Sequence, residues 1–250
     1  ELALACASHN GELAHVRTAA AMLAKAGLDD SVLECGAHWP YHEVSSRALA
    51  AAGAVPGALH NNCSGKHAGF VCLGCLIAGA QDHRAFLAGY VEPGHPVMRE
   101  VGAAIEAATG CDLGHAPHGT DGCSIPTYGI PLRQLALGFA RLASGNGLPA
   151  GRAAAAARLR RAMARAPFMV GGTGRFDSRV MQALGERVFC KVGAEGMYCA
   201  AMPEAGLGVA IKVDDGNNSR ACEVAMAALI EAFVLLPADA ERRLLARLSD

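Results

Sequence analysis

The spacing of apolar residues along the first two thirds of the chain predicts a series of helices. In segment 12–28, Leu13, Val16 and Leu23 recur at intervals that place them on one face of a helix. Pro96 suits a first helical turn and Gly110 a helix end. Helices are predicted at 12–28, around 45–52, and at 66–78, 96–109, 131–143 and 150–166.

Beyond Pro167 the pattern changes to short runs of β-compatible residues interrupted by glycines. Three strands are predicted at 187–192, 197–201 and 208–213, the last two joined as a hairpin around 203–206. Asn217, Asn218 and Ser219 suit the cap of a helix at 220–234, and another helix is predicted at 237–248. Helices followed by a meander favour a single α+β domain over residues 1–250.

Composition excludes several classes of protein. Of the 250 residues 52% are hydrophobic, which predicts a globular protein with a large core. The net charge is −1, and no basic block alternates with aromatic residues, so no nucleic-acid partner is expected. No apolar run approaches ~18 residues, so no transmembrane helix is expected. The ten cysteines are scattered, which favours free thiols in a reducing compartment and hence a cytoplasmic location.

Two polar clusters carry most of the candidate chemistry. Segment 61–70 reads N-N-C-S-G-K-H-A-G-F and enters an apolar helix, whose N-terminus favours thiolates and anions. Cys63 and Lys66 share one helical face. Cys123 follows Asp121 in a second cluster, so two sulfurs could bind zinc if the loops meet. A lysine ligand would have to be neutral. The alternative is two small buried cysteines beside a surface lysine.

Ser8 lies in the segment S-H-N-G-E, at a predicted junction between a loop and a helix. Ser8 or Asn10 could cap that helix. Alternatively Ser8 is a nucleophile, which needs a nearby base. Lys191 is the candidate base, because K-V-G after a strand is similar to the K-[ST]-G strand of serine β-lactamases.

Three other motifs have structural interpretations. Cys72 and Cys75 form a C-x-x-C within an apolar helix, where core packing is favoured over redox chemistry. His115 and His118 are expected to line a loop. The glycine-rich segment 171–177 has neither the Lys-[Ser/Thr] of a P-loop nor the G-x-G-x-x-G spacing of a dinucleotide-binding motif. It is interpreted as a loop near the site.

Together these segments resemble the asparaginase II family, of the type found in Rhizobium etli and related bacteria. The matching blocks follow the family's order along the chain: 7–12, 61–69, 121–123, 171–177 and 191–196. The resemblance implies a fold like those of serine β-lactamases and glutaminases, with an antiparallel sheet packed by helices. It also implies hydrolysis of the small molecule L-asparagine to L-aspartate and ammonia.

The resemblance further implies roles for particular residues. Ser8 and Lys191 match one of the family's two Ser/Lys pairs, and Asp121 is expected close to a metal-bound water. His67 and Asn62 are predicted to bind substrate. The positions that match the family's zinc ligands are Cys63, Lys66 and Cys123.

One departure from the family pattern bears on activity. The family's other Ser/Lys pair lies in an R-S-x-x-K-P motif upstream of S-H-x-G-E, and the sequence starts after that point. We interpret the sequence as a fragment and expect it to hydrolyse asparagine at least ~100-fold more slowly than a form with the motif. Alternatives are a catalytically impaired, zinc-stabilised remnant and a related amidohydrolase such as a glutaminase. A homodimer is the candidate assembly.

Overall fold

The computed structural model describes residues 1–235, and the chain divides into two compact units. Unit 1 comprises Glu1–Ala103, Pro117–Gly129 and Phe168–Thr173. Unit 2 comprises Ala104–Ala116, Ile130–Pro167 and the described part of Gly174–Asp250. That all 250 residues form a single domain stays a prediction. The helix predicted at 237–248 lies outside the described residues.

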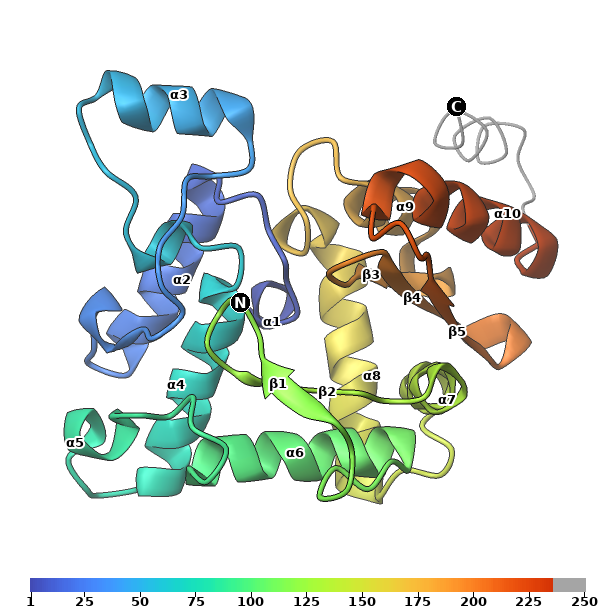
Figure 1. Cartoon of the computed structure of the whole chain (residues 1–250), viewed down its shortest axis with the longest axis horizontal. Coiled ribbons are helices and arrows are strands. Elements are labelled where there is room, and N and C mark those ends of the chain that lie inside the picture. Colours follow the sequence, from blue (N-terminus) through green and yellow to red (C-terminus); the bar gives the residue numbers. More distant parts are fainter. Residues whose placement is uncertain (236–250) are drawn as a thin grey trace. The chain divides into compact units, whose positions relative to one another are not determined.

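Unit 1 is mainly helical and is built around α4 (Ser64–Ala78), which packs against α1, α2 and α5. Gly65 and Gly74 of α4 bring its backbone close to Leu4 and Leu87, two fully buried residues of the unit's core. Figure 1 shows these helices in blue and cyan, with the short hairpin in green. The other elements are α1 (Leu2–Ala5), α2 (Leu13–Lys25), α3 (Glu43–Ala51), α5 (His83–Leu87), the first half of α6 (Pro96–Thr109), β1 (His118–Thr120) and β2 (Pro126–Tyr128).

Unit 2 combines an antiparallel sheet with helices. The strands β3 (Phe189–Val192), β4 (Met197–Met202) and β5 (Leu207–Lys212) pair in the order β3-β4-β5. Helix α7 (Leu132–Ser144) packs on β5 and β4, and Gly208 permits this because a Cβ there would overlap the backbone of α7. The remaining helices are α8 (Ala150–Arg165), α9 (Phe176–Leu184) and α10 (Glu223–Phe233).

Most elements predicted from the residue pattern are confirmed. The three strands, the hairpin connection and the helices α2, α3, α4, α6, α7, α8 and α10 lie within a few residues of their expected bounds. The mixture of helices with two small antiparallel sheets agrees with an α+β class. Asn217 caps the last helical segment, accepting hydrogen bonds from the backbones of Ser219 and Arg220.

Two expectations need correction. Neither Ser8 nor Asn10 caps α2: the N-cap is Glu12, whose backbone N–H donates to Nδ1 of His15 at 3.1 Å. The segment 171–177 is only partly a loop, because α9 begins at Phe176. Its apolar residues Phe176, Val180, Met181 and Leu184 recur at helical spacing and are buried, a signal that the interpretation of this segment as a loop overlooked.

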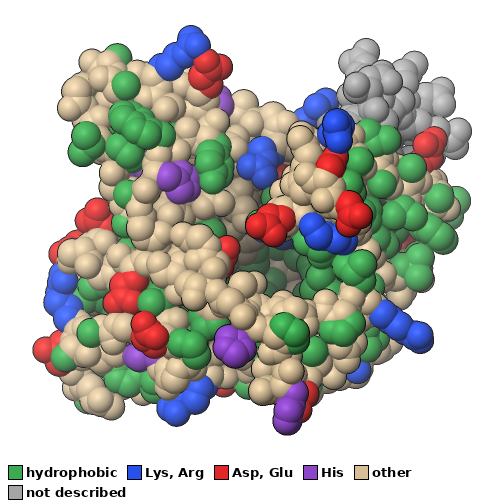
Figure 2. Space-filling view, in the orientation of Figure 1, with side chains coloured by type: hydrophobic (Ala, Val, Ile, Leu, Met, Phe, Trp, Pro, Cys, Tyr) green, Lys and Arg blue, Asp and Glu red, His purple; other side chains and the backbone are tan. Residues whose placement is uncertain are grey.

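The surface of unit 1 around α3 exposes several large apolar side chains. No residue of α3 is buried, and Trp39, Tyr41, Val44 and Val55 are exposed in and beside it. Figure 2 shows several separate hydrophobic side chains over this part of the unit, among charged and other polar groups. Among residues 1–235, none of the helices has the length and apolar character needed to span a membrane. None of the ten cysteines, which all lie within the described residues, forms a disulfide bond.

The first turn of α10 in unit 2 contains an acid with a perturbed pKa. Burial first, and then the negative charge of Asp177, raise the pKa of Glu223 from 4.5 to about 7 against the opposing effect of Arg175 and Arg179. Asp177 is itself fully buried, and its Oδ2 has no hydrogen-bond partner within the described residues. In unit 2, Asp177 therefore disfavours the ionised form of Glu223.

This pair predicts a pH dependence of stability. Because the folded-state pKa of Glu223 is raised, the folded protein holds the proton more tightly, and stability falls as pH rises from 4.5 to about 7. Over that range wild type should lose about 1 kcal/mol of unfolding free energy relative to Glu223→Gln, after allowance for solvent screening. Urea denaturation at several pH values measures the difference. Glu231→Gln, on the exposed side of α10, should show the same pH dependence of stability as wild type.

Candidate active site

The loop that leads into α4 is held by Asn61. Its side-chain oxygen accepts from the Cys63 backbone N–H at 2.8 Å, and its Nδ2 donates to the Cys35 carbonyl at 2.7 Å. Cys63 occupies the N-cap position of α4, and Lys66 lies within the first turn. Both side chains are therefore presented by a helix start whose backbone dipole favours negative charge.

Cys123 approaches this helix start from the turn between β1 and β2. The turn closes through a hydrogen bond from the Ser124 N–H to the Asp121 carbonyl at 2.9 Å, with Ser124 at φ 74°. Cys123 Sγ donates to Asp121 Oδ2 at 3.0 Å, and Lys66 Nζ donates to Cys123 Sγ at 3.2 Å. Lys66 Nζ also lies 3.9 Å from Asp121 Oδ2. The two polar clusters thus meet in unit 1. We call Cys63, Lys66, Asp121 and Cys123 the thiol cluster.

The ionisable groups of the thiol cluster differ in how strongly their pKa values are shifted. The neighbouring Cys123 side chain, supported by the Lys66 charge against burial, lowers the pKa of Cys63 to about 7. The neighbouring Cys63 side chain and burial raise the pKa of Cys123. Burial lowers the pKa of Lys66, but the two cysteines and Asp121 together outweigh it and raise that pKa on balance. Cys63 is therefore the more acidic thiol, and Lys66 is an ammonium group beside it.

The donor atoms can be compared with what zinc requires. Within the part of the chain that the structure describes, no group of three or more His, Cys, Asp or Glu residues is arranged to hold a metal ion. The thiol cluster instead offers two sulfurs and one amine nitrogen, which suit tetrahedral zinc in kind. Because Lys66 is protonated, a metal ion would have to displace its proton. The donor set fits zinc on that condition.

The Ser8 loop is anchored on both sides by backbone hydrogen bonds. The N–H of Ser8 donates to the Val170 carbonyl at 3.1 Å, and that of Asn10 to the Gly171 carbonyl at 2.8 Å. Between them the His9 N–H donates to the Asn62 carbonyl at 3.0 Å. The loop is therefore joined to the segment that precedes Cys63 and to segment 168–173.

His9 strengthens the link between the Ser8 loop and α4. The imidazole is fully buried, its Nδ1 accepts from the Gly11 N–H at 3.0 Å, and its Nε2 lies 3.0 Å from Ser64 Oγ. Because a backbone N–H can only donate, Nε2 carries the proton and donates to Ser64. The sequence indicated no role for His9, although its place between two polar segments could have suggested one.

A second buried group, Glu12, was also missed from the sequence. Its two carboxylate oxygens accept from the Thr173 N–H and Oγ1, each at 2.7 Å. Burial opposes ionisation, but these hydrogen bonds lower the pKa of Glu12 overall. Gly172, at φ +110°, is required beside them, because any Cβ there would overlap the carboxylate. The glycine-rich segment therefore binds a carboxylate of its own chain.

The two predicted substrate-binding residues differ in their surroundings. The Asn62 backbone N–H donates to His38 Nε2 at 2.9 Å, and the side chain is half-buried. His67 is fully buried, with its Nδ1 2.6 Å from the Tyr90 hydroxyl. Both residues flank Cys63 and Lys66 in the chain, but the Asn62 side chain is the more accessible.

Lys191 lies on β3 of unit 2, opposite Cys199 of β4, as its predicted strand requires. Its Nζ donates to the Val192 carbonyl at 2.7 Å. Since Lys191 and Ser8 belong to different units, their pairing stays a prediction.

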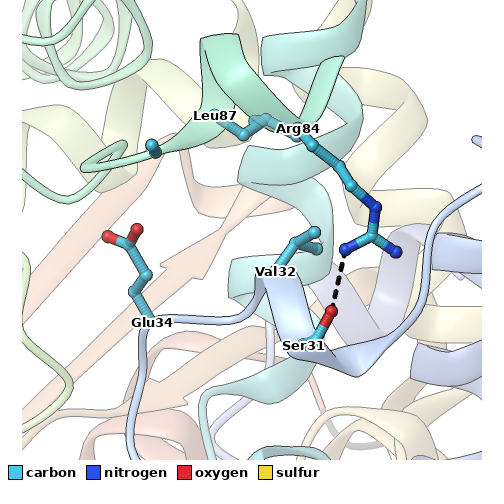
Figure 3. A pocket seen from close by; sticks show the side chains of 6 residues that line it. Ser31, Val32, Glu34, Arg84 and Leu87 are labelled. Atoms are coloured by element: carbon cyan, nitrogen blue, oxygen red, sulfur yellow. Dashed lines mark hydrogen bonds between the residues drawn. The ribbon is translucent and has the colours of Figure 1, made fainter. Parts of the chain in front are cut away.

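Unit 1 also has a cavity of about 210 Å³ whose lining includes none of the predicted site residues. Figure 3 shows Arg84 pointing toward Ser31, with Glu34 on the opposite wall. Both charged groups already have partners: Arg84 also contacts Asp29, and Glu34 accepts from the Gly89 N–H at 2.8 Å. These contacts stabilise the wall between η1 (Asp30–Val32) and α5.

Comparison with known proteins agrees with the sequence motifs. No curated protein matched the chain. A family model described as L-asparaginase II matches residues 1–249, almost the whole length. That family implies a hydrolase that acts on amides. With this match running through the Ser8 loop, the thiol cluster and β3, the chain belongs to the L-asparaginase II family.

Proposed function

We propose that this protein is an L-asparaginase, which hydrolyses the side-chain amide of L-asparagine to L-aspartate and ammonia. The observation that carries the proposal is the thiol cluster, because Lys66 and Cys123 lie 3.2 Å apart beside Cys63 within a chain that the family model matches throughout. The antiparallel sheet of unit 2, with α7 and α10 packed against it, supports a fold of the serine β-lactamase type.

The proposed chemistry is nucleophilic catalysis by a Ser/Lys pair. Neutral Lys191 takes the proton of the Ser8 hydroxyl as Ser8 Oγ bonds to the amide carbon of the substrate. The tetrahedral intermediate collapses with loss of ammonia, which receives the proton from Lys191. Water then attacks the resulting ester, releasing aspartate and restoring Ser8. The strand position of Lys191 and the anchored Ser8 loop support these roles.

Cys63, Lys66 and Cys123 would hold the zinc ion. Bound there, zinc would supply Lewis-acid polarisation or orientation of the substrate. Asp121, which accepts a hydrogen bond from the protonated Cys123 thiol, would bind a water molecule at the cluster once zinc holds that sulfur as a thiolate. Of the two predicted substrate contacts, Asn62 is the better supported, because its side chain is partly accessible. A homodimer and a cytoplasmic location stay predictions.

The decisive experiment is ammonia release by the full-length protein from L-asparagine, L-glutamine and a chromogenic β-lactam, with and without added zinc. Asparagine should be the preferred substrate, and chelation should lower turnover. Release from glutamine alone would identify a glutaminase instead. Release from none of the three, by a folded and zinc-loaded protein, would indicate a non-catalytic family member.

The metal site can be tested apart from activity. Cys63→Ser should lower the amount of zinc retained after dialysis, because it removes one of two sulfur donors. Cys111→Ser is the matched control, since Cys111 is equally buried but belongs to unit 2. Equal zinc content in the two variants would contradict the proposed ligands.

A further inference from the structure

His38 of unit 1 lies outside every sequence block that resembles the family, yet it contacts a predicted substrate-binding residue. Its Nε2 accepts a hydrogen bond from the backbone N–H of Asn62 at 2.9 Å. Its Nδ1 lies 2.7 Å from the carbonyl oxygen of Trp39. The carbonyl of Asn62 accepts in turn from the His9 N–H at 3.0 Å. The backbone of Asn62 is therefore held on both sides, by the segment before α3 and by the Ser8 loop.

These contacts fix which nitrogen of the His38 ring bears the hydrogen. A backbone N–H can only donate, and a carbonyl oxygen can only accept. Nε2 therefore offers its lone pair to Asn62, and Nδ1 carries the hydrogen and donates to Trp39. The opposite tautomer would set two donors against each other at Nε2 and two acceptors against each other at Nδ1. The imidazolium form would still oppose two donors at Nε2.

The side-chain amide of Asn62 must fit the same nitrogen of His38. The end of the amide assigned as Oδ1 lies 3.2 Å from Nε2. The oxygen and the nitrogen of an amide have nearly the same shape, so they are told apart by the hydrogen bonds around them. Because Nε2 has no hydrogen to give, an oxygen there would oppose two acceptors, and the NH₂ group belongs at this end. The amide oxygen is then at the other, accessible end of this half-buried side chain.

Packing keeps the imidazole of His38 in place. The Tyr41 ring stacks on it, with ring centroids 4.6 Å apart and planes inclined by 17°. At the next residue, the His42 backbone N–H donates to the Asn10 carbonyl at 3.2 Å. Segment 38–42 is therefore fastened to the Ser8 loop as well as to Asn62, and the ring is held against the amide that it orients.

We infer that His38 is a positioning residue for substrate selection: it holds the NH₂ group of the Asn62 amide toward its own ring, so that the amide oxygen accepts from the side-chain carboxamide of asparagine. Of the two donor groups of this substrate, the ammonium and the carboxamide, only the second distinguishes it from its product. Aspartate has a carboxylate there, which would set two acceptors against each other. The identity of the substrate rests on the proposed function, whereas the orientation of Asn62 does not.

The test compares asparagine and aspartate on full-length wild type and His38→Phe. Phenylalanine keeps a ring to stack on Tyr41 but removes the acceptor, so the Asn62 amide becomes free to turn its NH₂ group toward a carboxylate. Aspartate should then inhibit more strongly while the KM for asparagine rises. The ratio of the aspartate Ki to the asparagine KM should fall about 10-fold. A loss of packing alone would weaken both ligands together, so an unchanged ratio overturns the inference.

His95→Phe is the matched control. His95 is also half-buried in unit 1, accepts from the backbone N–H of Val97 at 3.2 Å and lies 2.8 Å from the carbonyl oxygen of Phe86. The control should leave the ratio unchanged, because these partners lie outside the predicted site. In an Asn62→Ala background, His38→Phe should no longer alter the ratio, since His38 acts through that amide. A full effect in that background would contradict the inference.

Nitrogen-15 NMR separates a failure of this inference from a failure of the proposed function. With labelled histidine, the His38 signals are those missing in His38→Phe, and two-bond couplings to the ring protons show which nitrogen bears the hydrogen. Wild type should carry it on Nδ1, and a hydrogen on Nε2 overturns the inference even if the variants fail to fold. If wild type does not hydrolyse asparagine, calorimetric titration with both amino acids gives the same ratio. Absence of turnover then refutes only the proposed reaction.

Discussion

Replacing Lys191 by methionine should lower kcat for asparagine hydrolysis by about 10²–10⁴-fold, the usual contribution of a positioned base. Methionine keeps most of the stem of the side chain and loses the amine. Lys191 lies between Cys190 and Val192, which are both buried, so the strand should retain its packing. Steady-state ammonia release measures kcat, and the denaturation midpoint shows whether the fold is retained.

The control for this substitution is Lys212→Met on β5 of the same sheet. Lys212 is exposed and its amine donates to the Glu195 carbonyl. The Lys212→Met variant should keep near-normal turnover, because the lost amine is exposed and has no part in the proposed mechanism. Near-normal turnover in Lys191→Met itself would remove this residue from the mechanism and would require another base for Ser8.

The Gly65→Ala substitution should destabilise unit 1 by about 3 kcal/mol, at the upper end of the range for overpacking a core. A Cβ at this position would lie 2.9 Å from the Leu4 carbonyl carbon and closer still to its oxygen and Cγ. Two of these atoms are backbone, so a change of rotamer cannot relieve the overlap. Either α1 or the first turn of α4 must move, and that first turn contains Lys66.

Gly69→Ala, one turn further along α4, is the matched control. Its Cβ would meet only the Ala5 Cβ, at 3.3 Å, which a small shift relieves. Because alanine favours a helix over glycine by about 0.5–1 kcal/mol, this variant should be neutral or slightly more stable. Urea denaturation of the two variants measures the difference. Equal stability would show that α1 does not pack against α4 as closely as described.

The regular helices and strands were predictable because their signals are local. Apolar residues at helical spacing predicted α2, α4 and α7, and glycine-bounded β-compatible runs predicted the sheet of unit 2. Helix α9 was missed although Phe176, Val180 and Leu184 recur at helical spacing, because the glycines of segment 171–177 were interpreted as a loop. The N-cap of α2 was misplaced because Glu12 takes that position with support from His15, a partner that N-cap preferences alone do not indicate.

The candidate site was likewise predictable from the sequence only in part. Unusual residue types in a short polar segment, at a helix start, identified Cys63 and Lys66, and the order of the motifs along the chain indicated Cys123 and the family. Those inferences needed only residue identity and spacing. They could not say which groups share a proton or a hydrogen bond.

Tertiary structure decided the partners of the site residues. Tyr90 meets both His67 and the Glu34 backbone, and Thr173 meets Glu12, across separations of tens to more than a hundred residues that leave no periodic signal. Each pair forms because a buried polar group must find a partner wherever the fold brings one within reach. Residue order was therefore enough to establish the family and most helices and strands. The protonation and orientation of the thiol cluster followed only from packing, which depends on the whole of unit 1.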